Sequence, residues 1–101
     1  MRSSRRLDVT EDAEDDLRSI LEYTLATWGE RQRDVYAARI DLALDELIQH
    51  PYWGRPRDDL SPGLRSRLVE KHVVYYRVDD DVVTITRILH EKMDAASHLR
   101  P

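Results

Sequence analysis

The spacing of apolar residues changes once along this chain, at Pro51. Before that proline the apolar residues recur every three or four positions, whereas beyond residue 64 they fill alternate or successive positions in short runs rich in Val, Ile, Tyr and Thr. The first spacing is that of one helix face, and the second is that of strands. A helical half followed by a stranded half predicts an α+β fold, with helices packed on a mainly antiparallel sheet.

The helical half predicts two helices joined by a tight turn. Thr10 is a suitable N-cap, and acidic residues crowd the turns that follow it, where the helix dipole favours negative charge. Gly29 can end the first helix, and Pro51 ends the second because it disfavours helical geometry at the residue before it. So short a connection predicts an antiparallel hairpin. The expected buried stripes are Ala13, Leu17, Ile20, Leu21, Thr24 and Trp28, then Tyr36, Ile40, Ala43, Leu44, Leu47 and Ile48.

The stranded half predicts an antiparallel meander whose connecting segments are of hairpin length. A short first strand, a structured loop that holds three of the four prolines, and a short helical tail complete the expected order β-α-α-β-β-β plus tail. The meander strands are residues 64–69, 72–78 and 82–89, the first strand is 5–9, the loop is 50–65 and the tail begins at about Lys92.

Both faces of the predicted meander are apolar. Val73 and Tyr75 alternate with Val74 and Tyr76, so neither set of side chains is polar. A helix hairpin covers only one face of a sheet, and a large exposed apolar face is typical of an interaction site. We therefore expect a partner to cover the second face, with coverage by the tail alone as the alternative.

The composition limits the classes of function. We expect a single domain, residues 1–101, located in the cytoplasm and without membrane contact, because the chain has no cysteine and no apolar stretch of membrane-spanning length. The net charge of −4 disfavours nucleic-acid binding by bulk electrostatics. Arginine supplies 14 of the 16 basic side chains, and it suits paired contacts with carboxylate or phosphate groups.

The stretch RILHEKMDAASHL, residues 87–99, gathers many of the side chains that carry chemistry. His90, Asp94 and His98 have the spacing of metal ligands on one helix face. The preceding strand continues to Leu89, however, so His90 falls at a junction and not within a helical turn. We therefore expect neither a metal nor a cofactor.

Phosphodiester cleavage is a second possibility, because a metal-free ribonuclease needs an acid, a base and cations that stabilise the developing charge. Strand alternation puts Arg87 on the face of Ile85 and Leu89. It puts His90 on the face of Ile88, so the pleat separates the two unless a bulge intervenes. The residues alone favour a third role, in which the stretch ties the tail to the sheet. The ribonuclease candidates are Arg65, Arg67, Arg87 and His90.

A set of short motifs extends along nearly the whole chain. The motifs are Asp16-Leu17, Ile20, Tyr23-Thr24, Trp28-Gly29, Tyr36, residues 54–60, residues 63–65, residues 72–77, residues 87–90, Met93-Asp94 and His98-Leu99. In this order and at these intervals they resemble the ParE toxins of bacterial type II toxin–antitoxin modules, from about residue 7 to residue 100.

This resemblance implies a fold similar to that of the RelE ribonucleases and a toxin that poisons DNA gyrase without being an enzyme. It also implies a ParD-like antitoxin whose C-terminal segment wraps the toxin in a hetero-oligomeric complex, with operator DNA contacted only through the antitoxin. RelE-like cleavage of messenger RNA is the alternative. It is disfavoured because no tyrosine follows residue 76 and because the chain is acidic where ribosome-binding toxins are basic.

The resemblance leaves the contact residues open, so we take candidates from the loop, the tail and the aromatic positions. The candidate target contacts are Trp53, Arg55, Arg57, Arg87, His90, Lys92 and Met93. The candidate antitoxin contacts are Trp28, Tyr36, Val74 and Tyr76.

Overall fold

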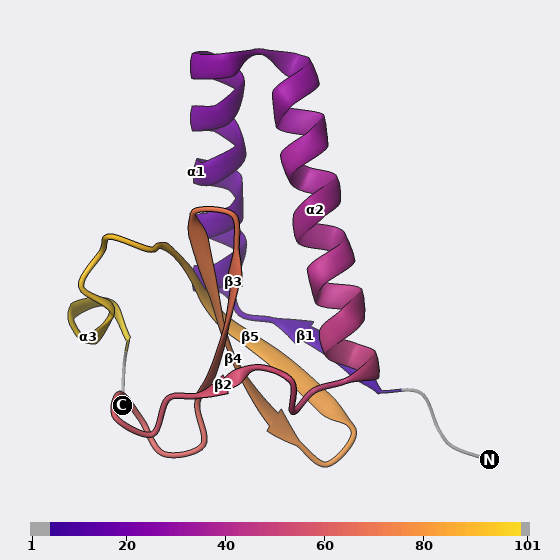
Figure 1. Ribbon diagram of the computed structural model, residues 1–101, viewed down its shortest axis with the longest axis vertical. Coiled ribbons are helices and arrows are strands. Elements are labelled where there is room, and N and C mark those ends of the chain that lie inside the picture. The colour runs from indigo at the N-terminus through magenta and orange to yellow at the C-terminus, as the bar shows by residue number, and fades with distance from the viewer. Residues whose placement is uncertain (1–4, 100–101) are drawn as a thin grey trace.

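The computed structural model describes residues 5–99 and has the predicted α+β architecture, a two-helix hairpin packed on a five-stranded sheet (Figure 1). The predicted order of helices and strands is confirmed, and one short strand, β2, was not predicted. The elements are β1 (Arg6–Val9), α1 (Glu11–Trp28), α2 (Glu30–Gln49), β2 (Arg55–Pro56), β3 (Arg65–Val69), β4 (His72–Asp79), β5 (Val82–His90) and α3 (Ala95–His98). Within residues 5–99 no helix combines the length and apolar character of a membrane span.

The helix hairpin begins and turns at the predicted residues. The Thr10 side chain accepts a hydrogen bond from the Ala13 N–H at 3.1 Å, and its hydroxyl donates to the Thr86 carbonyl at 2.9 Å. The same side chain therefore caps α1 and fastens it to β5. Gly29 ends α1 and begins α2 with φ +95°, a backbone conformation that residues with a side chain rarely adopt.

The sheet has the strand order β1-β5-β4-β3-β2. The meander is antiparallel, as predicted, whereas β1 pairs in parallel with β5, its register running from Arg6 opposite Val82 to Val9 opposite Ile85. A parallel pair of strands needs a crossover connection between them. Here the crossover consists of all the elements from α1 to β4. The first and last strands of the chain thus lie side by side.

The main core lies between the hairpin and one sheet face. Most of the predicted helix stripe is buried there, but Trp28 is 70% exposed because the far end of the hairpin projects beyond the sheet (Figure 1). The buried members of this core are Ala13, Tyr36, Ile40, Ala43, Leu44, Leu47, Val69, Val74, Tyr76, Val83, Ile85 and Ile88.

The second sheet face is also covered, which corrects the expectation that a partner must cover it. Tyr75 and Leu89 are buried there together with Leu64, and Leu60, Val73, Ala95 and Leu99 pack around them. The loop between β2 and β3 and the C-terminal tail supply this cover. The tail alone therefore does not cover this face, because Leu60 and Leu64 of the loop pack there beside Ala95 and Leu99 of the tail.

A bulge in β5 changes which residues share a face. Tyr76 lies opposite Ile85 whereas Tyr75 lies opposite Arg87, so Thr86 is the extra residue. The prediction that Arg87 shares a face with Ile85 and Leu89 is therefore wrong for Ile85 and right for Leu89. Ile85 and Ile88 both face the helices, and only Leu89 shares the face of Arg87. The pleat still separates Arg87 from His90.

Tyr76 fixes the loop that follows α2. Its hydroxyl donates to the Pro51 carbonyl at 2.7 Å and accepts from the Gly54 N–H at 2.9 Å. A Cβ on Gly54 would overlap the Tyr76 hydroxyl and lie 2.7 Å from two of its ring carbons. Glycine is therefore required at position 54 by the close approach of a buried ring, and not by its own backbone conformation.

We expect Gly54→Ala to lower the free energy of unfolding by about 1–3 kcal/mol, because the added methyl group overpacks a rigid site. Urea denaturation measures the change. The control is a double-mutant cycle with Tyr76→Phe, which removes the hydroxyl that the methyl group meets. Strictly additive effects of the two substitutions would contradict this explanation.

Candidate functional site

A partly buried ion pair between Asp16 and Arg87 joins α1 to β5. The Asp16 carboxylate accepts from Arg87 Nε at 2.7 Å and from Nη2 at 2.8 Å, and also from the Ile88 N–H at 2.9 Å. Arg87 Nη1 donates to the His98 carbonyl at 2.8 Å. The two side chains are only 14% and 20% exposed. Asp16 raises the pKa of Arg87 above its ordinary value through these hydrogen bonds, so the guanidinium stays charged and fixed.

A cavity of about 240 Å³ adjoins this pair, lined by Thr10, Ser61, Arg77 and Arg87 among others. Two arginines in one cavity suggest an anion site. Arg77, however, donates to the Ser61 hydroxyl at 2.6 Å and to the Pro62 carbonyl at 2.5 Å. Both guanidinium groups are thus engaged in holding the loop and the tail on the sheet.

A second polar cluster joins α2, β4 and β5. Tyr36 donates to the Val69 carbonyl at 3.0 Å, and His72 Nδ1 lies 2.6 Å from the same hydroxyl. Because a hydroxyl has one proton, His72 Nδ1 must donate in this contact. The His90 ring meets the His72 ring edge-on with 5.2 Å between centroids. Burial, and then the charge of Glu70, raises the pKa of Tyr36 to about 12.

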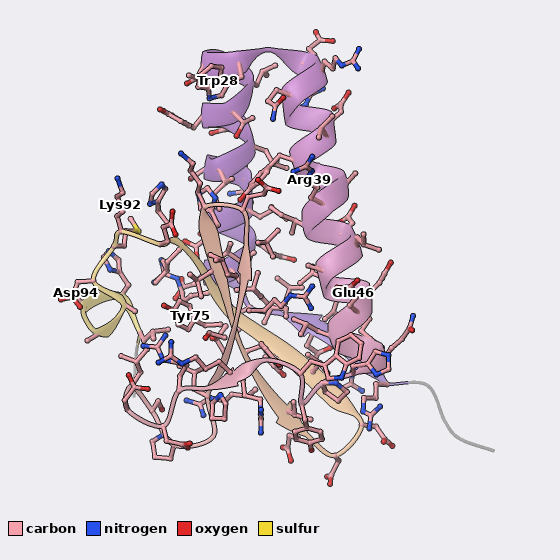
Figure 2. All side chains as sticks on the ribbon, in the orientation of Figure 1. Trp28, Arg39, Glu46, Tyr75, Lys92 and Asp94 are labelled. Atoms are coloured by element: carbon pink, nitrogen blue, oxygen red, sulfur yellow. The ribbon has the colours of Figure 1, made fainter. Side chains whose placement is uncertain are left out.

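This cluster forms the floor of an open groove at the projecting end of the hairpin. The groove has a volume of about 410 Å³, and its lining includes Trp28, Tyr36, Glu70, His72 and His90. Trp28 lies at the end of α1 (Figure 2). The combination of an exposed indole with polar groups below it is suited to holding a side chain of a partner.

The four ribonuclease candidates do not converge. Arg67 pairs with Glu46 of α2, and Arg65 donates to the Tyr52 and Gly54 carbonyls. Arg87 is held by Asp16 on the opposite face of the sheet. Arg67, Arg87 and His90 line three different cavities, so no common substrate position is formed by these side chains.

The candidate target contacts divide into exposed and held residues. Trp53, Arg55, Lys92 and Met93 are exposed on the loop and the tail, as Figure 2 shows for Lys92. The others are half-buried: Arg57 pairs with Asp59, Arg87 pairs with Asp16, and the Nδ1 atom of His90 accepts from the Lys92 N–H.

Three of the four candidate antitoxin contacts are buried. Val74 and Tyr76 are fully buried beneath the helix hairpin, whereas Tyr36 of α2 is 8% exposed and lines the groove beside Trp28. Trp28 alone of the four is exposed. Its place in the apolar stripe of the first helix predicts a core position, yet it lies beyond the edge of the sheet.

Several important residues escaped sequence reasoning. Asp16 lies in the acidic run for which the sequence indicates only favourable placement at the helix N-terminus, and only a tertiary contact distinguishes it from Asp15. His72 was treated as an ordinary strand residue. Tyr52, whose ring carries the Arg65 guanidinium at 5.0 Å, lies next to the predicted Trp53 and shares its exposure. No cluster of metal-ligating residues is present between residues 5 and 99.

Comparison with known proteins decides the family. A family model described as the ParE toxin of the type II toxin–antitoxin system parDE matches residues 7–95. The chain belongs to the ParE toxin family. Toxin ParE1 of Caulobacter vibrioides is 37% identical over 87 residues, which cover 86% of this chain and 90% of the relative. Toxin ParE of Escherichia coli is 32% identical over 93 residues, which cover 90% and 89%.

Solved structures support the fold of this ParE-family chain. The chromosomal ParDE toxin–antitoxin system of P. aeruginosa gives a TM-score of 0.74 at 24% identity, covering 86% of this chain and 96% of the solved chain. The RelBE2 toxin–antitoxin complex of Mycobacterium tuberculosis gives 0.65 at 24% identity, covering 87% and 99%. The fold is thus shared by ParE and RelE toxins, and fold alone does not choose between their activities.

We expect Asp16→Ala to lower the free energy of unfolding by about 2–4 kcal/mol, because it leaves a buried guanidinium and the Ile88 N–H without their acceptor. The matched control is Asp15→Ala. Asp15 pairs with Arg18 in solvent, so its loss changes stability very little. Equal midpoints for the two variants in urea denaturation would disprove the structural role of Asp16.

We expect His72 to make stability depend on pH in the weakly acidic range. Burial, and then the charge of His90, lowers the pKa of His72 below 6.5, against a smaller opposing effect of Glu91. The unfolded chain therefore binds the proton more readily. Stability is fully present above pH 6.5 and is lost as the pH falls below that value toward the lower folded pKa.

The measurement is urea denaturation of the wild type and of His72→Asn at several pH values between about 7.5 and 5.5. The asparagine amide can still donate to the Tyr36 hydroxyl but does not titrate, so the variant loses part of the slope. His98→Asn on the tail is the matched histidine-to-asparagine control. An unchanged slope in His72→Asn would contradict the assignment of this pH dependence to His72.

Proposed function

We propose that this ParE-family toxin acts by binding DNA gyrase and blocking replication, and that it is not an enzyme. The observation that carries the proposal is the engagement of its arginines. Arg65 donates to two backbone carbonyls, Arg67 pairs with Glu46, and Arg87 pairs with Asp16. A ribonuclease would need those cations on a phosphate, and freeing Arg87 would leave Asp16 buried without its partner.

The target surface in this proposal is formed by the loop that holds β2 and by the tail. Trp53 and Met93 are exposed by 64% and 48%, and Arg55 and Lys92 lie beside them in the sequence, exposed as well. Aromatic, methionine and arginine side chains are the ones most enriched at protein interfaces. The partly buried Arg87 and His90 position the tail and contribute little surface of their own.

The antitoxin in this proposal is a ParD-like protein, and it docks on the hairpin groove beside Trp28. The two helices together hold eleven acidic and four basic residues, which favours an antitoxin segment with basic side chains over this surface. Solved relatives from P. aeruginosa and M. tuberculosis are toxin–antitoxin systems. The complex is then a hetero-oligomer of a single-domain cytoplasmic toxin, and operator DNA is bound only through the antitoxin.

The direct test is purified toxin with gyrase and plasmid DNA. We expect inhibition of supercoiling and accumulation of cleaved plasmid. We expect Met93→Ala to raise the toxin concentration required for inhibition about tenfold, because truncation of an interface residue that contributes moderately to the binding energy has an effect of this size. Leu42→Ala, which removes an apolar side chain exposed by 60% on α2, leaves inhibition unchanged. Normal supercoiling at saturating wild-type toxin would refute gyrase as the target.

Transcript mapping separates this proposal from RelE-like cleavage of messenger RNA. Induction of the toxin in growing cells is expected to stop DNA synthesis first and to leave transcript ends unchanged. New ends within translated messages, abolished by His90→Ala and retained in Met93→Ala, would establish the ribonuclease alternative and overturn the gyrase proposal.

A further inference from the structure

The outer edge of β1 has no pairing strand. β1 lies at one end of the sheet (Figure 1), and in the described part of the chain it pairs with β5 alone. The Arg6 N–H donates to the Asp81 carbonyl at 2.7 Å, and the Thr10 N–H donates to a carbonyl of β5 at 3.0 Å. Because backbone groups alternate in direction along a strand, the N–H and carbonyl groups of Leu7 and Val9 point away from the sheet.

This edge is open, and it is longer than the free edge at the other end of the sheet. A groove of about 500 Å³ lies along it, with Leu7, Val9 and Glu14 in its lining. At the other end, β2 is only two residues long and ends in proline, and it leaves just Arg67–Val69 of β3 uncovered. Addition of a further strand is therefore better supported at β1.

β1 lacks the features that usually protect an edge strand from a second copy of the same chain. Proline, a bulge or a charge such as lysine commonly prevents edge-to-edge pairing. The sequence of β1, RLDV, has no proline or lysine, and its pairing with β5 has no register shift. Its two charged side chains, Arg6 and Asp8, are 70% and 47% exposed. They lie on the sheet face away from the helices, because Leu7 and Val9 pack against the main core.

The two charges are complementary to themselves about Leu7. In an antiparallel pair of β1 strands centred on Leu7, the outward N–H and carbonyl groups of the two Leu7 residues bond each other. Arg6 of each copy then lies directly opposite Asp8 of the other copy, at the positions where cross-strand side chains are closest. A pair centred on Asp8 would instead place two carboxylates opposite each other. The charges thus favour one register and one occupant, a second copy of this chain.

We propose that the outer edge of β1 is a dimer interface, at which two copies of this chain join their sheets through antiparallel β1 strands. The interface is isologous, so the same residues serve on both sides. Within one chain Arg6 Nε lies 3.1 Å from Asp8 Oδ1, and in the dimer the four side chains form one cluster of alternating charge. The strand β2 lies at the opposite end of the sheet, so its loop is not part of this interface.

The test is sedimentation equilibrium of the antitoxin-free toxin over a range of concentrations, for which we expect a reversible equilibrium between monomer and dimer. Arg6→Asp weakens dimerisation about tenfold or more, because it replaces two attractive cross-strand pairs by two pairs of like charge. Asp8→Arg weakens it for the same reason. Both side chains are exposed, and circular dichroism excludes loss of the fold as the cause.

A mixture of the two variants is the sharper experiment. The Arg6→Asp chain has two acidic residues at this edge and the Asp8→Arg chain has two arginines, so antiparallel pairing of one with the other restores opposite charges at both positions. We expect the mixture to form heterodimers more strongly than either variant associates with itself. Arg31→Asp is the control, because it makes the same change of charge at the start of α2, at the projecting end of the hairpin (Figure 1). This control dimerises as the wild type does.

Amide hydrogen exchange identifies the strand edge that is used. We expect the N–H groups of Leu7 and Val9 to become protected as the toxin concentration rises, whereas the N–H group of Leu68 does not. Leu68 is a matched control on the uncovered part of β3. Its backbone groups point outward by strand alternation, since the carbonyl of Leu64 on the same side accepts from the Arg57 N–H.

A toxin that remains monomeric at concentrations up to about 1 mM would overturn the inference, and so would equal dimerisation of Arg6→Asp and Arg31→Asp. Protection of Leu68 in place of Leu7 and Val9 would assign the dimer to the other edge and overturn it as well. If Leu7 and Val9 are protected only when an antitoxin is bound, the edge belongs to an antitoxin strand and not to a second copy. The supercoiling assay decides the proposed function separately, because self-association is measured without gyrase.

Discussion

The carboxylate of Asp16 is the point at which the separate parts of this structure are joined. It satisfies both nitrogens on one side of Arg87 and the backbone N–H of Ile88, and the remaining side of the same guanidinium holds the tail through the His98 carbonyl. The three elements α1, β5 and the tail are thereby tied together at one point. Thr10 acts alongside it, since the hydroxyl that caps α1 also binds the carbonyl of the bulge residue Thr86.

These contacts determine where function can reside. With the hairpin on one face of the sheet and the loop and tail on the other, the apolar residues of both faces are covered within the chain. The arginines that suggested phosphate chemistry serve as internal ties. What remains for recognition is the periphery, namely the projecting end of the hairpin, the loop after α2 and the tail. These surfaces differ in charge and composition, so they suit different partners.

The sequence predicted the elements well because helix and strand periodicity, Thr10, Gly29 and Pro51 are local signals. It failed where the decisive contact is remote in sequence. The bulge at Thr86 has no local marker, and it regroups Ile85, Ile88 and Leu89 between the faces. The cover over Tyr75 and Leu89 is assembled from single apolar residues, such as Leu60 and Leu99, spread over forty positions. For the site, residue type predicted the exposed candidates on the loop and the tail. The burial of Val74 and Tyr76, in contrast, depends on which face of their strand packs against the helices.

The parallel pairing of β1 with β5 has a consequence for the synthesis of this chain. The partner residues of β1 begin at Val82, so the first strand has no place in a sheet until most of the protein has left the ribosome. Arg87, which fixes α1 to the sheet, emerges later still, and His98 last. Early segments can form the helix hairpin, but the edge strand and its ties require the final residues. A shorter chain that lacks β5 therefore has neither the pairing partner of β1 nor the guanidinium that fixes α1.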